Sequence, residues 1–215
     1  MKAIQTRPRA KPANRQEAKK ARRHELIQAT IKCVARSGLS GTTMADITKE
    51  AGLSLGIVNL HFQSKEKLLE ETLRSISEEY VEGWRKIGCR PGIDNAQRLQ
   101  ACIDFDFSSR ICDRNKLAVW FAFMSESKAR PTYQKICSAH EAAVDETLQG
   151  ICEALIKEGK YQRVNSRVIV RSYTALATGL WLDILVDPKA VDRQLGKQLC
   201  HDYFAAVFPR NFAPD

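Results

Sequence analysis

Apolar residues recur at intervals of three and four along most of this 215-residue chain, which is the spacing of one face of an α-helix. The first such stretch covers residues 18–37 and ends at Gly38, in the position where glycine commonly closes a helix. Short helices are expected at 44–51 and 55–61, and a long helix from 65 to about 87. No alternating strand pattern of any length follows, so the sequence predicts an all-α fold.

Five further helices are predicted beyond the break GCRPG at 88–92, over residues 94–112, 115–127, 130–158, 165–186 and 190–207. Their ends fall at proline, glycine or charged residues that stop or start helices. The chain therefore divides into three parts. An arm at 1–17 lacks apolar periodicity and is expected to be disordered, and it is followed by a small unit at 18–68 and a larger helical unit at 69–215.

The two short helices are joined by a turn of about three residues that contains Gly52. Thr43 is a good N-cap for the first of them, and Gly52 supplies the left-handed backbone conformation that a sharp turn needs. Together they form the pattern of a helix-turn-helix. The side chains left outward on the second helix are mostly short, which would let it enter a DNA major groove; they are Ser54, Leu55, Gly56, Asn59 and His61.

The charge distribution supports a nucleic-acid partner. The net charge is +9, and residues 1–23 alone hold nine Lys or Arg against one Glu. Residues 69–215 are neutral, with twenty basic and twenty acidic side chains. A basic arm on a neutral body is expected of a protein that meets nucleic acid or an anionic surface, although a solubilising tail has the same composition.

Other features argue for a cytoplasmic protein without catalytic machinery. The uncharged apolar run at 172–182 is well short of the roughly 20 residues that span a bilayer. Seven scattered cysteines without a C-x-x-C pair suggest reduced, mostly buried thiols. The sequence HEAAV that begins at His140 lacks the second histidine of a zinc-protease helix, and no glycine-rich phosphate loop is present. We therefore predict no enzyme activity, metal or cofactor.

One carboxylate stands out. Asp106 shares a helical face with Leu99, Cys102 and Ile103, which would bury it. A buried carboxylate must be paired, hydrogen-bonded or protonated, or must face a cavity. With Trp and Phe faces nearby it could hold a quaternary ammonium group, and the alternative is a salt bridge to an arginine such as Arg110 or Arg171.

The last two predicted helices carry the features of a subunit interface. Residues 172–185 alternate small side chains with large ones, and small residues let two helices approach closely. The helix at 190–207 carries its own apolar stripe of Leu195, Leu199, Tyr203, Phe204 and Val207. These two helices could pair with the same two helices of a second copy in a four-helix interface with two-fold symmetry.

The stretch TTMADITKEAGLSLGIVNLHFQSKEKLL, residues 42–69, resembles the DNA-binding domain of TetR-family transcriptional regulators. The resemblance implies a homodimer that binds a palindromic operator. It places Thr42 among the DNA-contacting residues, together with phosphate contacts by Thr43, His61 and Lys65 and base contacts by Ser54, Leu55 and Gly56. Asn59 stands where the family usually has Tyr, which puts a phosphate contact in doubt and suggests a part in base recognition.

The segments AVWFAFMSESKARPTYQKI at 118–136 and ATGLWLDIL at 177–185 resemble the BetI-type members, which regulate choline-to-glycine-betaine synthesis. This implies a ligand-responsive repressor whose effector is choline or another quaternary ammonium compound. Its predicted site comprises Asp106, Trp120, Phe123, Tyr173 and Trp181. There are three rival interpretations. The first is a regulator with an unrelated effector, and the second is an α-bundle enzyme. The third is a DNA-binding dimer without a ligand, and a cavity in the larger unit would argue against it.

Overall fold

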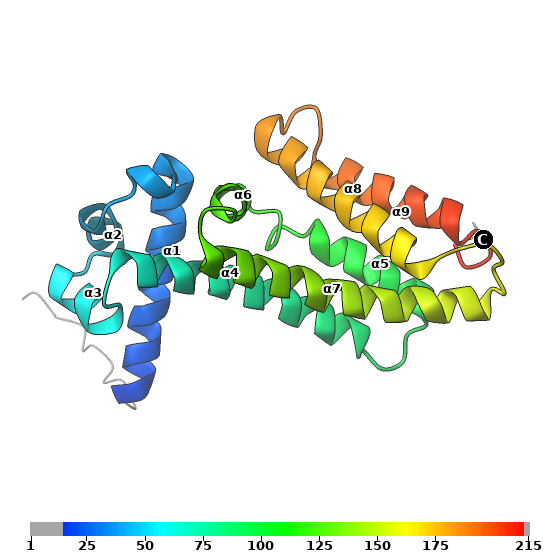
Figure 1. Cartoon of the computed structure of the whole chain (residues 1–215), viewed down its shortest axis with the longest axis horizontal. Coiled ribbons are helices and arrows are strands. Elements are labelled where there is room, and N and C mark those ends of the chain that lie inside the picture. Colours follow the sequence, from blue (N-terminus) through cyan, green and yellow to red (C-terminus); the bar gives the residue numbers. More distant parts are fainter. Residues whose placement is uncertain (1–14, 213–215) are drawn as a thin grey trace, which may run out of the picture.

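The computed structural model describes residues 15–212, and within that range the chain is built of helices without a strand. The predicted all-α fold is therefore confirmed (Figure 1). The helices are α1 (Arg15–Gly41), α2 (Met44–Ala51), α3 (Leu55–His61), α4 (Lys65–Gly88), α5 (Asn95–Asp106), α6 (Arg114–Glu126), α7 (Pro131–Glu158), α8 (Ser166–Val186) and α9 (Arg193–Val207).

Several ends of predicted helices differ from the structure, most of all the start of α1 and the end of α5. α1 begins at Arg15, so the last residues of the predicted arm are helical, while residues 1–14 lie outside the described range. The helix that was expected to run to 112 ends at Asp106. The carbonyl of Ser108 accepts hydrogen bonds from the N–H groups of Ile111 and Cys112, which turns the chain before α6. Asp106 is thus the last residue of its helix.

The helix-turn-helix forms through local capping. The Thr43 hydroxyl accepts the N–H of Asp46 at 3.2 Å, and the Asp46 carboxylate accepts the Thr43 N–H at 3.0 Å, which makes a capping box at the start of α2. Gly52 closes α2 with φ 63° and ψ 30°, the left-handed conformation that the sequence predicted. Ser54 occupies the N-cap position of α3, but its hydroxyl makes no capping bond.

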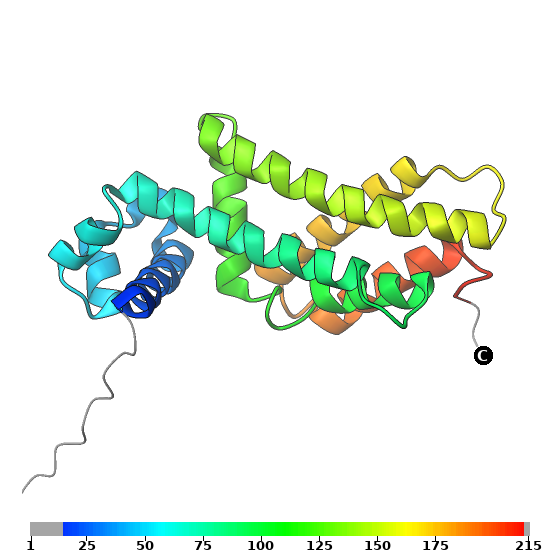
Figure 2. The same ribbon diagram turned by 90° about the horizontal axis from the view of Figure 1, so that it is seen from below.

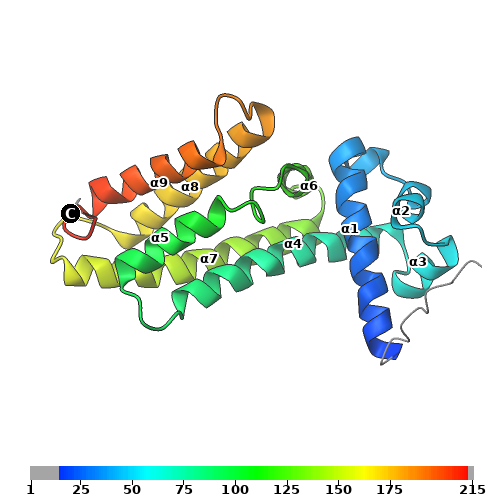
Figure 3. The same ribbon diagram turned by 180° about the vertical axis from the view of Figure 1, so that it is seen from behind.

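The helices form an elongated molecule with α1, α2 and α3 at one end (Figures 1 and 3). α4 leaves this end and runs beside α7, and α8 and α9 lie together along one side of the same region. α6 crosses between the two ends and packs on α1, as the view turned by 90° shows (Figure 2). The predicted boundary between 68 and 69 falls inside α4, so that helix is common to both parts.

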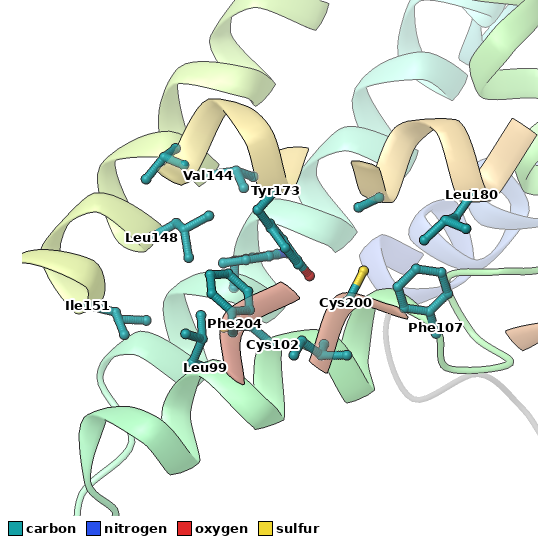
Figure 4. Close-up of a cluster of buried hydrophobic side chains, with 14 of the residues drawn as sticks. Leu99, Cys102, Phe107, Val144, Leu148, Ile151, Tyr173, Leu180, Cys200 and Phe204 are labelled. Carbon is teal, nitrogen blue, oxygen red and sulfur yellow. The ribbon is translucent and has the colours of Figure 1, made fainter. Parts of the chain in front are cut away.

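Two buried clusters hold the molecule together. The larger one is built from α4, α5, α7, α8 and α9, and Figure 4 shows Tyr173 of α8 near its centre, close to Phe204 of α9. The second cluster joins α1–α4 to α6 and the start of α7, and it includes Trp120 and Phe123. The core of the helix-turn-helix unit is therefore continuous with two helices of the larger unit.

Helix α8 is apolar enough, with a mean hydropathy of 1.3 over its most apolar window, and long enough to cross a membrane by length and composition. In the structure its large side chains are buried inside the protein. Tyr173, Leu180, Trp181 and Ile184 pack in the core against α6, α7 and α9. All seven cysteines are free thiols, and Cys89 is the exposed one among them.

Candidate effector cavity and helix-turn-helix surface

Asp106 is fully buried at the end of α5, and its carboxylate accepts three hydrogen bonds from neutral donors. Oδ1 accepts the hydroxyl of Tyr80 at 2.7 Å and the indole N–H of Trp84 at 2.8 Å, both from α4. Oδ2 accepts the hydroxyl of Tyr173 at 2.7 Å, from α8. The indole N–H of Trp181 binds the Asp106 backbone carbonyl at 3.2 Å. Two helices, α4 and α8, are therefore tied to the end of α5 through this one residue.

The predicted salt bridges to Asp106 are wrong. Arg110 pairs with Glu79, and Arg171 lies 3.9 Å from Glu141. Within residues 15–212 the carboxylate has no Lys or Arg partner. Burial destabilises the ionised carboxylate more than the three hydrogen bonds stabilise it, so the pKa of Asp106 is raised to about 7. The sequence-based prediction of burial was correct, and the partners are phenols and an indole.

A cavity of about 260 Å³ opens beside this carboxylate. Trp120, Tyr173 and Trp181 line it together with Asp106, as the sequence analysis predicted. Phe123 does not. It is fully buried one turn further along α6, where its ring packs edge-on against Tyr133 at 4.8 Å, and its assignment to the cavity wall is therefore wrong.

Three further aromatic residues of the cavity wall were missed. Tyr80 and Trp84 stand four residues apart on α4, a spacing that places both on one helical face. His140 of α7 is buried, with its ring stacked on Tyr80 at 4.9 Å and tilted against Trp120 at 4.4 Å. Helical spacing could have linked Tyr80 to Trp84, but nothing local linked either residue to Asp106.

The cavity is also lined by charged side chains that reach solvent. Glu141 and Asp145 of α7 contribute two carboxylates, and Arg171 of α8 contributes one guanidinium. Glu141 and Arg171 are exposed, and Asp145 is half-buried. The charged groups at the opening therefore sum to a net negative charge, which favours entry of a cation over an anion.

On the helix-turn-helix, Thr43 is exposed and Thr42 is not. The Thr42 side chain is fully buried, and its hydroxyl donates to the Gly38 carbonyl at 2.7 Å across the kink in α1. Thr42 is therefore part of the fold rather than of the DNA-contacting surface, which corrects its predicted role. The N–H groups of Met44 and Ala45 at the start of α2 have no acceptor among the described residues.

The outward side of α3 differs from the prediction at two residues, because His61 is partly buried and Leu60 is an additional outward side chain. Ser54, Leu55, Gly56 and Asn59 are all exposed. Leu60 is 76% exposed, more than any other large apolar residue of the described range, and was not among the predicted contacts. An uncharged, protruding helix face of this kind is suited to base edges and thymine methyl groups.

Basic side chains flank α3 on both sides. The guanidinium of Arg23 lies 4.6 Å over the ring of Phe62, and the charges of Arg23 and Lys19, after burial, lower the pKa of His61. The His61 Nδ1 is buried without a hydrogen-bond partner in the described structure. The Lys65 ammonium donates to the Leu39 carbonyl at 3.2 Å, which ties the start of α4 to the end of α1.

An apolar stripe remains exposed on α8 and α9. Its large members are Val168, Leu182 and Val186 of α8 and Leu195 and Leu199 of α9. Gly179 lies in the same stripe, and a Cβ added there would meet no atom of its own chain within 4 Å. The larger α8 side chains that were expected at the interface, and Phe204 of α9, are buried in the core instead.

Comparison with known families matches both parts of the chain. Residues 26–72 match the bacterial regulatory proteins of the TetR family, and residues 95–209 match the C-terminal domain of BetI-type transcriptional repressors. A curated relative from Vibrio vulnificus, the HTH-type transcriptional regulator BetI, is 27% identical, and the alignment covers 86% of this chain and 91% of the relative. The regulator of the same name from Paraburkholderia phymatum is 29% identical over 91% of this chain and 97% of its own length.

Solved structures show the same fold. A transcriptional regulator from Pseudomonas aeruginosa PAO1 superimposes with a TM-score of 0.77 at 24% identity, over 90% of this chain and 93% of its own. A regulator from Saccharomonospora viridis, solved in complex with choline, gives 0.76 at 20% identity, over 88% and 96% of the two chains. These are transcriptional regulators and not enzymes. With a family match that spans more than half of its length, the chain belongs to the BetI-type transcriptional repressors of the TetR family.

Proposed function

We propose that this repressor is a cytoplasmic homodimer that binds a two-fold symmetric operator and releases it when choline or a closely related quaternary ammonium compound enters the cavity beside Asp106. The observation that carries the effector assignment is a buried carboxylate held only by neutral donors at the wall of an aromatic cavity. The curated relatives named BetI and the structural neighbour with choline support the same choice, and control of choline-to-glycine-betaine genes follows from it.

A quaternary ammonium ion suits this cavity for two reasons. Its quaternary nitrogen has no N–H group, so it does not compete with Tyr80, Trp84 and Tyr173 for the lone pairs of the Asp106 carboxylate. Its charge is also compensated by the buried carboxylate and by the faces of aromatic rings, each of which contributes on the order of 1–2 kcal/mol when desolvated. Two or three rings together with the carboxylate are sufficient for micromolar affinity after association costs.

Two helices connect the cavity to the DNA-binding end. Trp120 lines the cavity, and its helix α6 packs on α1. α4 carries Tyr80 and Trp84 at the cavity and begins at Lys65 beside the helix-turn-helix. A ligand that favours one position of these helices changes the spacing of the two recognition helices in a dimer. By reciprocity, operator DNA then weakens effector binding by the same factor.

On the DNA side we assign α3 to the major groove and the start of α2 to a phosphate. The free N–H groups of Met44 and Ala45, together with the exposed Thr43, favour an anion at a helix N-terminus. His61 at the end of α3 and Lys65 at the start of α4 serve as further phosphate contacts. Leu55, Asn59 and the newly identified Leu60 project from α3 and would meet base edges, since they are exposed and uncharged.

The dimer is proposed to form through the exposed stripe on α8 and α9. Five large apolar side chains that reach solvent on two adjacent helices, together with Gly179, give a self-complementary surface for close helix packing. The cavity beside Asp106 argues against the rival in which this domain serves dimerisation alone.

The DNA contacts can be separated by substitution. Lys65→Ala should weaken binding to all sequences alike and lower the slope of log affinity against log salt by about one, because a phosphate contact releases a counterion. Asn59→Ala and Leu60→Ala should instead change the preferred bases. Selection from a random DNA pool checks this. A motif that is unchanged for both α3 variants would remove these residues from the base-reading set.

The dimer surface is tested at Gly179. Gly179→Leu should convert the dimer to a monomer at micromolar concentration, because the new side chain fits the single chain but separates the two copies. Gly150→Leu on α7 is the matched control, since that glycine also has no atom within 4 Å of its Cβ position and lies off the stripe. Sedimentation that shows an intact Gly179→Leu dimer would place the interface elsewhere.

The effector site is tested by calorimetry with choline. Asp106→Asn and Trp120→Ala should each weaken choline binding by about tenfold or more, because one removes the negative charge and the other an aromatic face. Phe123→Leu should leave the affinity unchanged, since Phe123 lies outside the cavity. Absence of measurable heat with choline and related cations at millimolar concentration would rule out this class of effector, while the DNA-binding function would stand.

Choline binding should weaken as the pH falls below about 7. Burial raises the pKa of Asp106 to about 7, so acid protonates the free protein, whereas the cation binds the ionised carboxylate. Affinity should fall by up to about tenfold per pH unit below that value and level off above it. Titrations over this range in wild type and Asp106→Asn check the assignment, and a wild-type profile as flat as that of the variant would contradict it.

A further inference from the structure

His140 is a buried polar residue of the cavity that neither the family resemblance nor the charge argument uses. It stands on α7, is 8% exposed and lines the cavity. Its ring is held on both faces, stacked on Tyr80 at 4.9 Å and packed against Trp120 at 4.4 Å. Its Nδ1 lies 3.2 Å from the Ser77 hydroxyl of α4. The imidazole therefore has a fixed position and orientation.

The protonation of this ring follows from its surroundings. Burial lowers the pKa of His140 to about 4, so the imidazole is neutral at physiological pH and has one donor and one acceptor nitrogen. Nδ1 faces the Ser77 hydroxyl, which can either donate to it or accept from it. When Nδ1 donates, Nε2 holds an unshared lone pair, and no group of the described residues hydrogen bonds to it.

His140 and Asp106 lie on either side of one residue. The Tyr80 hydroxyl donates to Asp106, while the face of the same ring stacks on His140. Both residues line the same cavity of about 260 Å³. The site thus has a carboxylate for a positive charge and, one tyrosine away, a neutral imidazole whose Nε2 is available for a hydrogen bond.

We propose that His140 is the specificity-determining residue of the effector site, with Nε2 accepting the hydroxyl proton of a quaternary ammonium alcohol whose cationic group lies by Asp106. This inference rests on the proposed function and adds to it a preference among cations. An alcohol supplies the donor that a neutral acceptor requires. An ether, an aldehyde or a carboxylate at the same place supplies only acceptors and leaves the His140 lone pair opposed to another lone pair.

The test compares choline with its methyl ether, (2-methoxyethyl)trimethylammonium, and with tetramethylammonium, which has no oxygen. Wild-type protein should bind choline about tenfold more tightly than the ether, since one buried hydrogen bond is at stake. His140→Phe keeps an aromatic ring but removes the acceptor, so it should bring choline to the affinity of the ether and leave tetramethylammonium within about twofold of wild type. His140→Gln, which restores an acceptor, should recover part of the preference.

Thr178→Val is the matched control, because Thr178 brings another hydroxyl to the cavity wall from α8. The choline-to-ether ratio should survive this change. Equal affinity of wild type for choline and its ether would overturn the role of His140 without any variant. So would a ratio that collapses in Thr178→Val and persists in His140→Phe. If no cation binds wild-type protein at millimolar concentration, the effector proposal fails and this inference fails with it, whereas cation binding without a hydroxyl preference overturns this inference alone.

Discussion

The buried carboxylate of Asp106 is the constraint on which the larger part of the molecule depends. Raising a carboxyl pKa from 3.8 to about 7 corresponds to roughly 4 kcal/mol against the charged form. The fold limits this cost with three hydrogen bonds from Tyr80, Trp84 and Tyr173, and these bonds link α4 and α8 to the end of α5. The same residues line the cavity. The arrangement that keeps the charge tolerable thus also forms the wall of the cavity in which we propose that a cation binds.

The connection between effector and DNA is short because the two parts share helices. α4 starts beside the recognition helix and carries two of the Asp106 donors, and α6 carries Trp120 and packs on α1. The buried cluster of the helix-turn-helix unit extends into α6 and α7 without interruption. Packed side chains transmit small displacements, because an interior of this density has few alternative arrangements. A shift of α6 or α4 at the cavity is therefore felt at α1.

Three sides of α8 have three different roles. Its largest side chains fill the core, Tyr173 and Trp181 form part of the cavity wall, and a stripe through Gly179 and Leu182 faces outward. These roles fall on different sides of a helix whose overall composition is apolar enough to resemble a membrane span. The proposed interface at this stripe accounts for the apolar residues on the side of α8 that a single chain exposes to water.

The sequence by itself determined the features that depend on neighbouring residues. The caps at Thr43 and Gly52 and the burial of Asp106 follow from spacing over a few positions, so reading the sequence predicted them correctly. It could not identify the partners of Asp106, since the donors lie 22, 26 and 67 residues away and only packing brings them to one carboxylate. Tertiary packing likewise decided that Trp120 reaches the cavity while Phe123, one turn further along α6, packs on Tyr133 and does not line it. It also buried Thr42 and brought His140 to the cavity, because the direction in which a helix face points is set by the helices around it and not by its own sequence.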